Sequence, residues 1–138
     1  MASLIPVQEK LLTTDAWAGQ TLKVALLTSA LTAAYNYTIH YTYTAVLAYE
    51  HAGGTGYTAG GASITTNSTT VNSTTVMLDS ALDTSWGPGA TLTNVKYAAL
   101  YDTVSLRIRA LYEFTAAQSC TNSTFTVQWH ANGMVRIL

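Results

Sequence analysis

Hydrophobic and polar residues alternate along most of this chain with the two-residue period of β-strands. Runs of β-branched and aromatic residues are separated by turn residues roughly every ten positions, which is typical of all-β proteins. We therefore predict an all-β fold, a single-domain antiparallel β-sandwich or jelly-roll-like barrel. The expected strands are residues 23–28, 63–67, 70–78, 91–101 and 106–114, followed by a hairpin of residues 125–129 and 134–138 around Asn132-Gly133.

Two details of this pattern carry expectations about packing. In residues 106–114, Leu106, Ile108, Ala110, Tyr112 and Phe114 should face one way, and Arg107, Arg109, Leu111 and Glu113 the other. Residues 79–89 are rich in Asp, Gly and Pro and predict a loop, in which Trp86 would close the open end of the core.

The first 20 residues do not share the strand pattern. Val7-Gln-Glu-Lys-Leu-Leu, which follows Pro6, can form a helical turn, because proline fits the first turn of a helix. An extended arm lying on a neighbouring molecule is an equally good interpretation. We therefore divide the chain into an N-terminal arm or short helix (1–20) and a β-domain (21–138), with Leu4, Ile5 and Pro6 as candidate interface residues.

Tyrosines recur with a two-residue period at positions 35, 37, 41 and 43. On a strand, Tyr35, Tyr37, Tyr41 and Tyr43 would share one face. Tyrosine offers a large contact area with a polar tip, so this face suits an interface between proteins. Packing of the same face under a sheet is the alternative.

Five of the nine glycines lie within residues 52–61: Gly53, Gly54, Gly56, Gly60 and Gly61. The stretch from Gly54 to Ala59 fits the relaxed G-x-G-x-x-G/A dinucleotide pattern, with Asp79 downstream. A pyrophosphate site needs a helix that begins at the loop, and the residues after Gly61 are poor helix formers. The tract is therefore interpreted as a bend between strands, with positive φ expected at Gly56 or Gly60.

Charged residues make up only 9% of the chain and the formal net charge is −1, so neutral hydroxyl groups must cover much of the surface. Low charge favours association between proteins and opposes nucleic-acid binding, which needs clustered lysine and arginine. No apolar run is long enough to span a membrane, and no signal peptide is recognisable at the amino terminus. We expect no nucleic-acid or membrane partner.

Residues that could carry chemistry are scattered. His40, His51 and His130 show no metal-ligand spacing, Cys120 and His130 are far apart for a nucleophile and its base, and Asp79 and Asp83 lack the ligand alternation of a calcium loop. Glu50-His51, next to the glycines, is the one acid–imidazole pair, and no third group accompanies it. We expect no catalytic site, no metal and no cofactor.

Four segments together carry a resemblance to a known family: Lys23-Val-Ala-Leu-Leu-Thr-Ser29, Tyr49-Glu50 with the tract Gly54–Gly61, Lys96-Tyr-Ala-Ala-Leu-Tyr-Asp102, and Thr124-Phe-Thr-Val-Gln-Trp129. In order and spacing, over roughly residues 20–138, they resemble the shared blocks of a small structural protein family of tailed bacteriophages and prophages. Residues 35–44 are an insertion relative to that pattern.

The resemblance implies a non-enzymatic virion component that is made in the cytoplasm of the host bacterium. The leading interpretation is a capsid decoration (cement) protein that binds the major capsid protein and forms a homo-oligomer, with a trimer expected. A tail, neck or fibre protein is the first alternative. A carbohydrate- or host-binding module is the second, with Trp17, Trp86 or Trp129 as stacking platforms.

Overall fold

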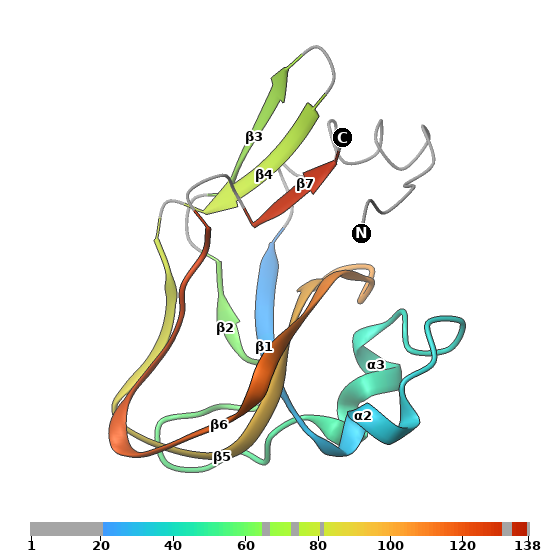
Figure 1. Cartoon of the computed structure of the whole chain (residues 1–138). Helices are drawn as coiled ribbons and strands as arrows, with labels where there is room; N and C mark the ends of the chain where they lie inside the picture. The colour runs from blue at the N-terminus through green and yellow to red at the C-terminus, as the bar shows by residue number, and fades with distance from the viewer. Residues whose placement is uncertain (1–20, 65–66, 73–74, 81, 131–133, 138) are drawn as a thin grey trace.

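The computed structural model describes residues 21–64, 67–72, 75–80, 82–130 and 134–137. Its elements are β1 (Leu22–Thr28), α2 (Ala30–Ala34), α3 (Tyr43–Val46), the 3-10 helix η2 (Leu47–Tyr49), β2 (Ala62–Ser63), β3 (Asn67–Asn72), β4 (Thr75–Ser80), β5 (Thr84–Asp102), β6 (Ile108–Val127) and β7 (Val135–Ile137). The strands form two antiparallel sheets, one in the order β2-β1-β5-β6 and one in the order β3-β4-β7 (Figure 1). The all-β prediction is confirmed at this level, and its finer form, a β-sandwich or jelly-roll-like barrel, stays a prediction.

The first predicted strand is confirmed as β1. Its inner residues Val24, Ala25, Leu26 and Leu27 are fully buried, as a nearly continuous apolar run predicts for a strand covered on both faces. β1 pairs with β5 on one side and with the short β2 on the other. It therefore lies inside the four-stranded sheet.

The long strands β5 and β6 form a bent antiparallel ribbon. The register shifts at several points between Trp86 and Tyr101, and Asn94 and Asn122 adopt positive φ. Bulges and left-handed residues bend and twist a strand pair, and Figure 1 shows the ribbon curving away from β1. The prediction of a loop over residues 79–89 is wrong for most of its length, because β4 extends to Ser80 and β5 begins at Thr84.

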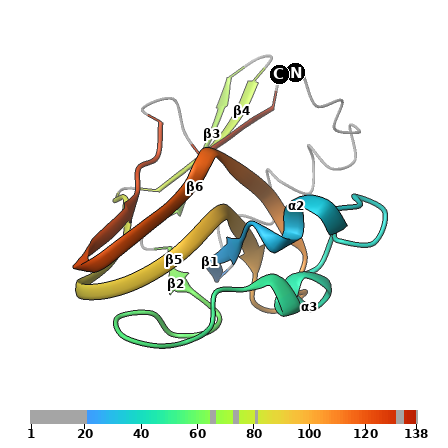
Figure 2. The same ribbon diagram turned by 60° about the horizontal axis from the view of Figure 1, so that its bottom comes forward.

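Two groups of buried side chains lie against the four-stranded sheet. The larger group joins Leu22, Val24 and Leu26 of β1 to Trp86, Ala90 and Leu92 of the bent part of β5, and to Tyr57, Val95 and Leu100. The smaller group places Leu31 of α2 and Val46 of α3 against Leu27, Tyr97 and Ala99. Both short helices therefore cover the sheet near the β1–β5 pair, as Figure 2 shows.

Two local predictions are corrected by the packing and the strand pairing. Ala110, Tyr112 and Phe114 pack against the larger group and Leu111 packs against the smaller one, as alternation predicts. Ile108, expected on the same face as Ala110, packs against the smaller group with Leu111. The change of face between Ile108 and Ala110 coincides with a register shift opposite Leu100 and Tyr101. The expected hairpin is also wrong, because residues 125–127 belong to β6 and β7 pairs with β4.

Some expectations fall outside the described residues. The N-terminal arm or short helix, with Leu4, Ile5 and Pro6, is one of them, and the Asn132-Gly133 turn is another. The division of the chain at residue 20 stays a prediction.

Candidate functional site

The glycine tract is a pair of tight turns packed on the sheet. Reciprocal hydrogen bonds between the backbones of Gly54 and Tyr57 close the first turn, and the Gly61 N–H donates to Thr58 O across the second. Gly56 and Gly60 occupy the third turn positions with φ of +78° and +95°, the conformation that favours glycine there. The expectation of positive φ at Gly56 or Gly60 is confirmed at both.

Close packing adds a second requirement for glycine. A Cβ placed on Gly56 would lie 2.6 Å from the Cα of Ala90, and one on Gly61 would overlap the carbonyl oxygen of Val24. Gly53 and Gly54 are different, because an added Cβ has ordinary clearance at Gly53 and open space at Gly54. The tract connects η2 to β2, so it is a bend, as predicted, but one that enters a strand from a 3-10 helix and not from another strand. A strand follows it in place of the helix that a phosphate-binding loop needs.

Glu50 holds this bend in place. Its carboxylate accepts hydrogen bonds from the hydroxyl of Tyr43 (2.6 Å), the hydroxyl of Tyr57 (2.7 Å) and the backbone N–H of Gly60 (2.7 Å). Tyr57 in turn accepts from the backbone N–H of Leu26, and Tyr101 donates to Gly60 O. The carboxylate therefore connects α3, the glycine tract and the sheet.

The same cluster alters the acidity of its phenols. Burial, together with the nearby Glu50 carboxylate, raises the pKa of Tyr43 and of Tyr57 well above the usual value of 10.0. Both phenols are therefore neutral hydrogen-bond donors at physiological pH. This arrangement stabilises the fold, because both neutral phenols donate hydrogen bonds to the Glu50 carboxylate.

Glu50 and His51 do not form an acid–imidazole pair. The His51 ring contacts backbone with both nitrogens: Nδ1 lies 2.7 Å from Ala52 O, and Nε2 accepts from the N–H of Thr93 at 3.1 Å. The imidazole therefore links the glycine tract to β5. The described residues include no group of three His, Cys, Asp or Glu side chains that could hold a metal ion.

The tyrosine-rich segment is not a strand. The Ala-rich stretch after β1 forms α2, and the hydroxyl of Thr42 accepts a hydrogen bond from Ala45 N–H at the start of α3. The four tyrosines consequently do not share a strand face. Tyr43 packs inward, with its ring stacked on Tyr101 at a centroid distance of 4.2 Å.

The other three tyrosines are exposed in the connection between the helices. Tyr35, Tyr37 and Tyr41 expose 46%, 78% and 54% of their surface, and Ile39 between them exposes 56%. An exposed run of large apolar side chains is typical of an interaction site. Three of the four tyrosines predicted for an interface thus point to solvent, and Ile39 joins them.

A second exposed segment lies beside this run. The turn between β5 and β6 carries Val104 and Leu106, and its backbone is hydrogen-bonded to the connection between the helices: Tyr43 N–H donates to Leu106 O, and Ile108 N–H donates to Tyr41 O. We call the six exposed side chains the aromatic surface; they are Tyr35, Tyr37, Ile39, Tyr41, Val104 and Leu106. Sequence reasoning missed Val104 and Leu106, because only this pairing brings the turn beside the tyrosines.

The backbone under the tyrosines is well anchored. Asn36 O accepts from the N–H groups of Ile39 and His40, and the side chain of Asn36 accepts from the N–H and hydroxyl of Thr38. The nearly buried His40 ring accepts from Asn36 N–H through Nδ1 and stacks on Tyr35 with a centroid distance of 6.0 Å. A surface fixed in this way loses little conformational entropy when it binds.

The tryptophans expected to serve as sugar-stacking platforms are placed differently. Trp86 is buried in the larger core group, and Trp129 is packed against it, with its indole N–H donating to the hydroxyl of Thr84. Trp17 lies outside the described residues. A stacking role for Trp86 is therefore wrong, because its ring is covered.

Two of the remaining candidates for chemistry have structural contacts. The Cys120 thiol lies on β6 and donates to Ala90 O, and Asp83 accepts from the backbone N–H of Trp129.

None of the helices in the described part of the chain has the length and apolar character to cross a membrane. Comparisons with known protein families, curated proteins and solved structures found no match.

Proposed function

We propose that this chain is a non-enzymatic structural protein of a bacteriophage virion, and that it is a capsid decoration protein that binds the major capsid protein. The observation that carries the proposal is the aromatic surface, whose exposed apolar side chains stand on anchored backbone. The sequence resemblance to phage structural proteins points in the same direction. The proposal also includes a β-sandwich or jelly-roll-like barrel fold, an N-terminal arm, and assembly into a homo-oligomer such as a trimer.

The chemistry of the aromatic surface suits a protein partner. Tyrosine is enriched at the centres of protein interfaces, where it buries a large area and keeps a hydroxyl for a hydrogen bond. A chain with 9% charged residues depends little on ion pairs for binding. We expect a contact in which buried apolar area provides most of the affinity, so that salt weakens it little.

The described contacts give no support to an enzyme. The Glu50 carboxylate accepts hydrogen bonds from three donors within the fold, and the His51 ring contacts backbone groups with both nitrogens. A protein that reinforces a shell needs only a stable fold and surfaces that bridge neighbouring subunits. The same surface would serve in a tail, neck or fibre, which is the alternative position.

The proposal is tested by adding the purified protein to capsids of the phage that encodes it, prepared without the protein. We expect wild type to co-sediment with the capsids, and a Tyr37→Ser, Val104→Ser double variant to bind at least about tenfold more weakly. Leu82→Ser is the matched control, because Leu82 is an exposed apolar residue in the connection between β4 and β5, outside the aromatic surface. It should bind like wild type.

Two results would contradict the proposal. Capsid binding by the double variant equal to that of wild type would remove the role of the aromatic surface. Failure of the wild-type protein to bind any capsid, while it assembles with tails or necks, would favour the alternative position.

A further inference from the structure

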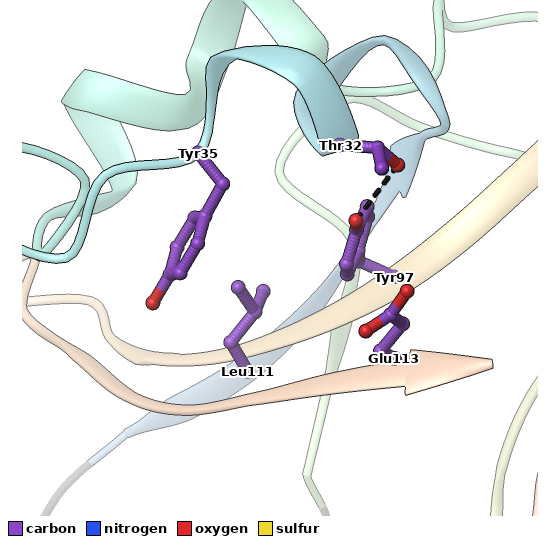
Figure 3. Close-up of a pocket in the computed structure, with 5 residues that line it drawn as sticks. All are labelled: Thr32, Tyr35, Tyr97, Leu111 and Glu113. Carbon is purple, nitrogen blue, oxygen red and sulfur yellow. Dashed lines mark hydrogen bonds between the residues drawn. The ribbon is translucent and has the colours of Figure 1, made fainter.

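A pocket of about 350 Å³ lies between α2 and the β5–β6 ribbon and shares Tyr35 with the aromatic surface. Its lining comes from three elements: Thr32 and Tyr35 from α2 and its end, Tyr97 from β5, and Leu111 and Glu113 from β6. Figure 3 shows Leu111 between the two tyrosines, with Thr32 above Tyr97 and Glu113 below it. The pocket therefore has an aromatic wall, an aliphatic floor and a polar side.

The aromatic wall is the half-exposed ring of Tyr35. His40 stacks along it with an angle of 19° between the ring planes, and His40 itself packs edge-on against Tyr49. The hydroxyl of Tyr35 points away from Tyr97 in Figure 3. A supported ring with one face occupied by His40 has its other face available for the flat side of a ligand.

The polar side offers both hydroxyl groups and a carboxylate. The hydroxyls of Thr32 and Tyr97 share one hydrogen bond of 2.8 Å, so the pair retains a second O–H and further lone pairs for a ligand. The Glu113 side chain is 59% exposed, and its Oε1 lies 3.4 Å from Lys96 Nζ. A carboxylate has two oxygens, so Glu113 can also accept a hydrogen bond from a ligand at Oε2.

The charges restrict what can bind. The Lys96 ammonium group, which donates to the carbonyl oxygens of Phe114 and Thr115, stands beside the Glu113 carboxylate. A cationic ligand at Glu113 would therefore come close to Lys96, and an anionic ligand would come close to Glu113; both approaches cost energy. A neutral ligand that donates and accepts hydrogen bonds meets neither penalty.

We propose that this pocket binds one saccharide unit of a glycan. A pyranose has a C–H face that packs on an aromatic ring and hydroxyl groups along its edge, which match the Tyr35 ring on one side and Thr32, Tyr97 and Glu113 on the other. The volume lies within the range of small-molecule sites, which combine apolar walls with a few polar groups. This proposal does not rest on the proposed function, but the pocket shares Tyr35 with the aromatic surface, so a capsid bound over Tyr35 would compete with the sugar.

The test is a titration of the isotope-labelled protein with methyl α-D-glucopyranoside, methyl α-D-galactopyranoside and N-acetylglucosamine, followed by NMR. We expect at least one sugar to shift the amide signals of Thr32, Leu111 and Glu113 in a saturable way. Tyr35→Ala should weaken this binding about three- to tenfold, the loss expected for one aromatic contact. Tyr35→Phe should keep it, because the ring remains.

Tyr37→Ala is the matched control, because Tyr37 is an exposed tyrosine of the same connection that does not line the pocket. It should bind the sugar like wild type, whereas Glu113→Ala should bind it more weakly. Saturable binding of N-acetylarginine amide in place of the sugars would overturn the proposal in favour of a cationic ligand. Absence of shifts with all three sugars, or equal losses in Tyr35→Ala and Tyr37→Ala, would also overturn it.

Discussion

Replacement of Gly61 by alanine tests the account of the glycine tract most sharply. Gly61 has φ of +76°, and a Cβ at this position would overlap the carbonyl oxygen of Val24 and lie 2.8 Å from the Cα of Ala25. Both obstacles are backbone atoms of the buried strand β1, which cannot move without disturbing the sheet. The substitution therefore combines backbone strain with overpacking.

The magnitude follows from these two effects. A non-glycine residue in the left-handed region costs roughly 1–2 kcal/mol, and overpacking in a dense interior costs about 1–3 kcal/mol. We expect Gly61→Ala to lower the free energy of unfolding by about 2–5 kcal/mol. That loss is a large part of the stability of a small domain.

Two neighbouring glycines supply matched controls. Gly60 has φ of +95°, but its added Cβ would meet nothing nearer than Tyr101 Oη at 3.6 Å, an ordinary contact, so Gly60→Ala should cost the strain alone, about 1–2 kcal/mol. Gly54 has neither a left-handed φ nor any atom within 4 Å of the added Cβ. Gly54→Ala should be neutral or stabilising by up to about 1 kcal/mol.

Urea-induced unfolding, followed by tryptophan fluorescence, measures all three variants on one scale. The expected order of stability is Gly54→Ala, then Gly60→Ala, then Gly61→Ala. Equal stability of Gly60→Ala and Gly61→Ala would refute the argument from close packing. A loss in Gly54→Ala as large as in the other two would refute the whole interpretation of this tract.

Three further predictions concern the ionisable groups. Glu50→Gln should lower the free energy of unfolding by about 1–3 kcal/mol in urea titrations, because three donors then face an amide with one acceptor oxygen. Full wild-type stability of this variant would contradict the stabilising role of the carboxylate. The pKa values of Tyr43 and Tyr57 are raised above 10.0, so their contribution to stability is present below pH 10 and is lost as pH rises further. Burial also raises the pKa values of Tyr101 and Tyr112, so near-ultraviolet absorption should show four phenols ionising late, together with alkaline unfolding; ordinary titration of all the phenols would count against it. Burial opposes ionisation of Asp102, but hydrogen bonds from Ser105 and Val104 and the charge of Arg109 outweigh burial and lower the pKa of Asp102 below the usual 3.8. The contribution of Asp102 to stability is therefore present above pH 3.8 and is lost as pH falls through the lowered pKa. Asp102→Asn should flatten the dependence of stability on pH in the acid range, and an unchanged dependence would argue against this role of Asp102.

The sequence predicts those elements whose determinants are local. β1 is recognisable because its run of apolar residues suits a strand covered on both faces, and the bend at the glycine tract is recognisable because its turns need positive φ. The tyrosine-rich segment is mispredicted because alternation alone does not distinguish a strand from turns. The Ala-rich stretch of α2 and the capping hydroxyl of Thr42 were the signals for helices there.

The candidate site depends on contacts between residues far apart in the chain. The alternation of hydrophobic and polar residues along the sequence cannot reveal such contacts. Glu50 meets Tyr43 and Tyr57 only because α3 and the glycine tract both pack against β1. Val104 joins the exposed tyrosines only because the β5–β6 turn pairs with the connection between the helices. The pocket likewise needs α2 to lie over β5 and β6.

A cryo-electron microscopy reconstruction of the phage particle proposed to carry this protein tests the central claim most directly. The account predicts density for many copies on the outside of the capsid shell, with the side of the molecule that carries Tyr37 and Val104 turned toward the major capsid protein or a neighbouring copy. Copies confined to a ring at the neck or tail would contradict the assignment to the capsid. Absence of the protein from the purified particle would contradict a virion role altogether.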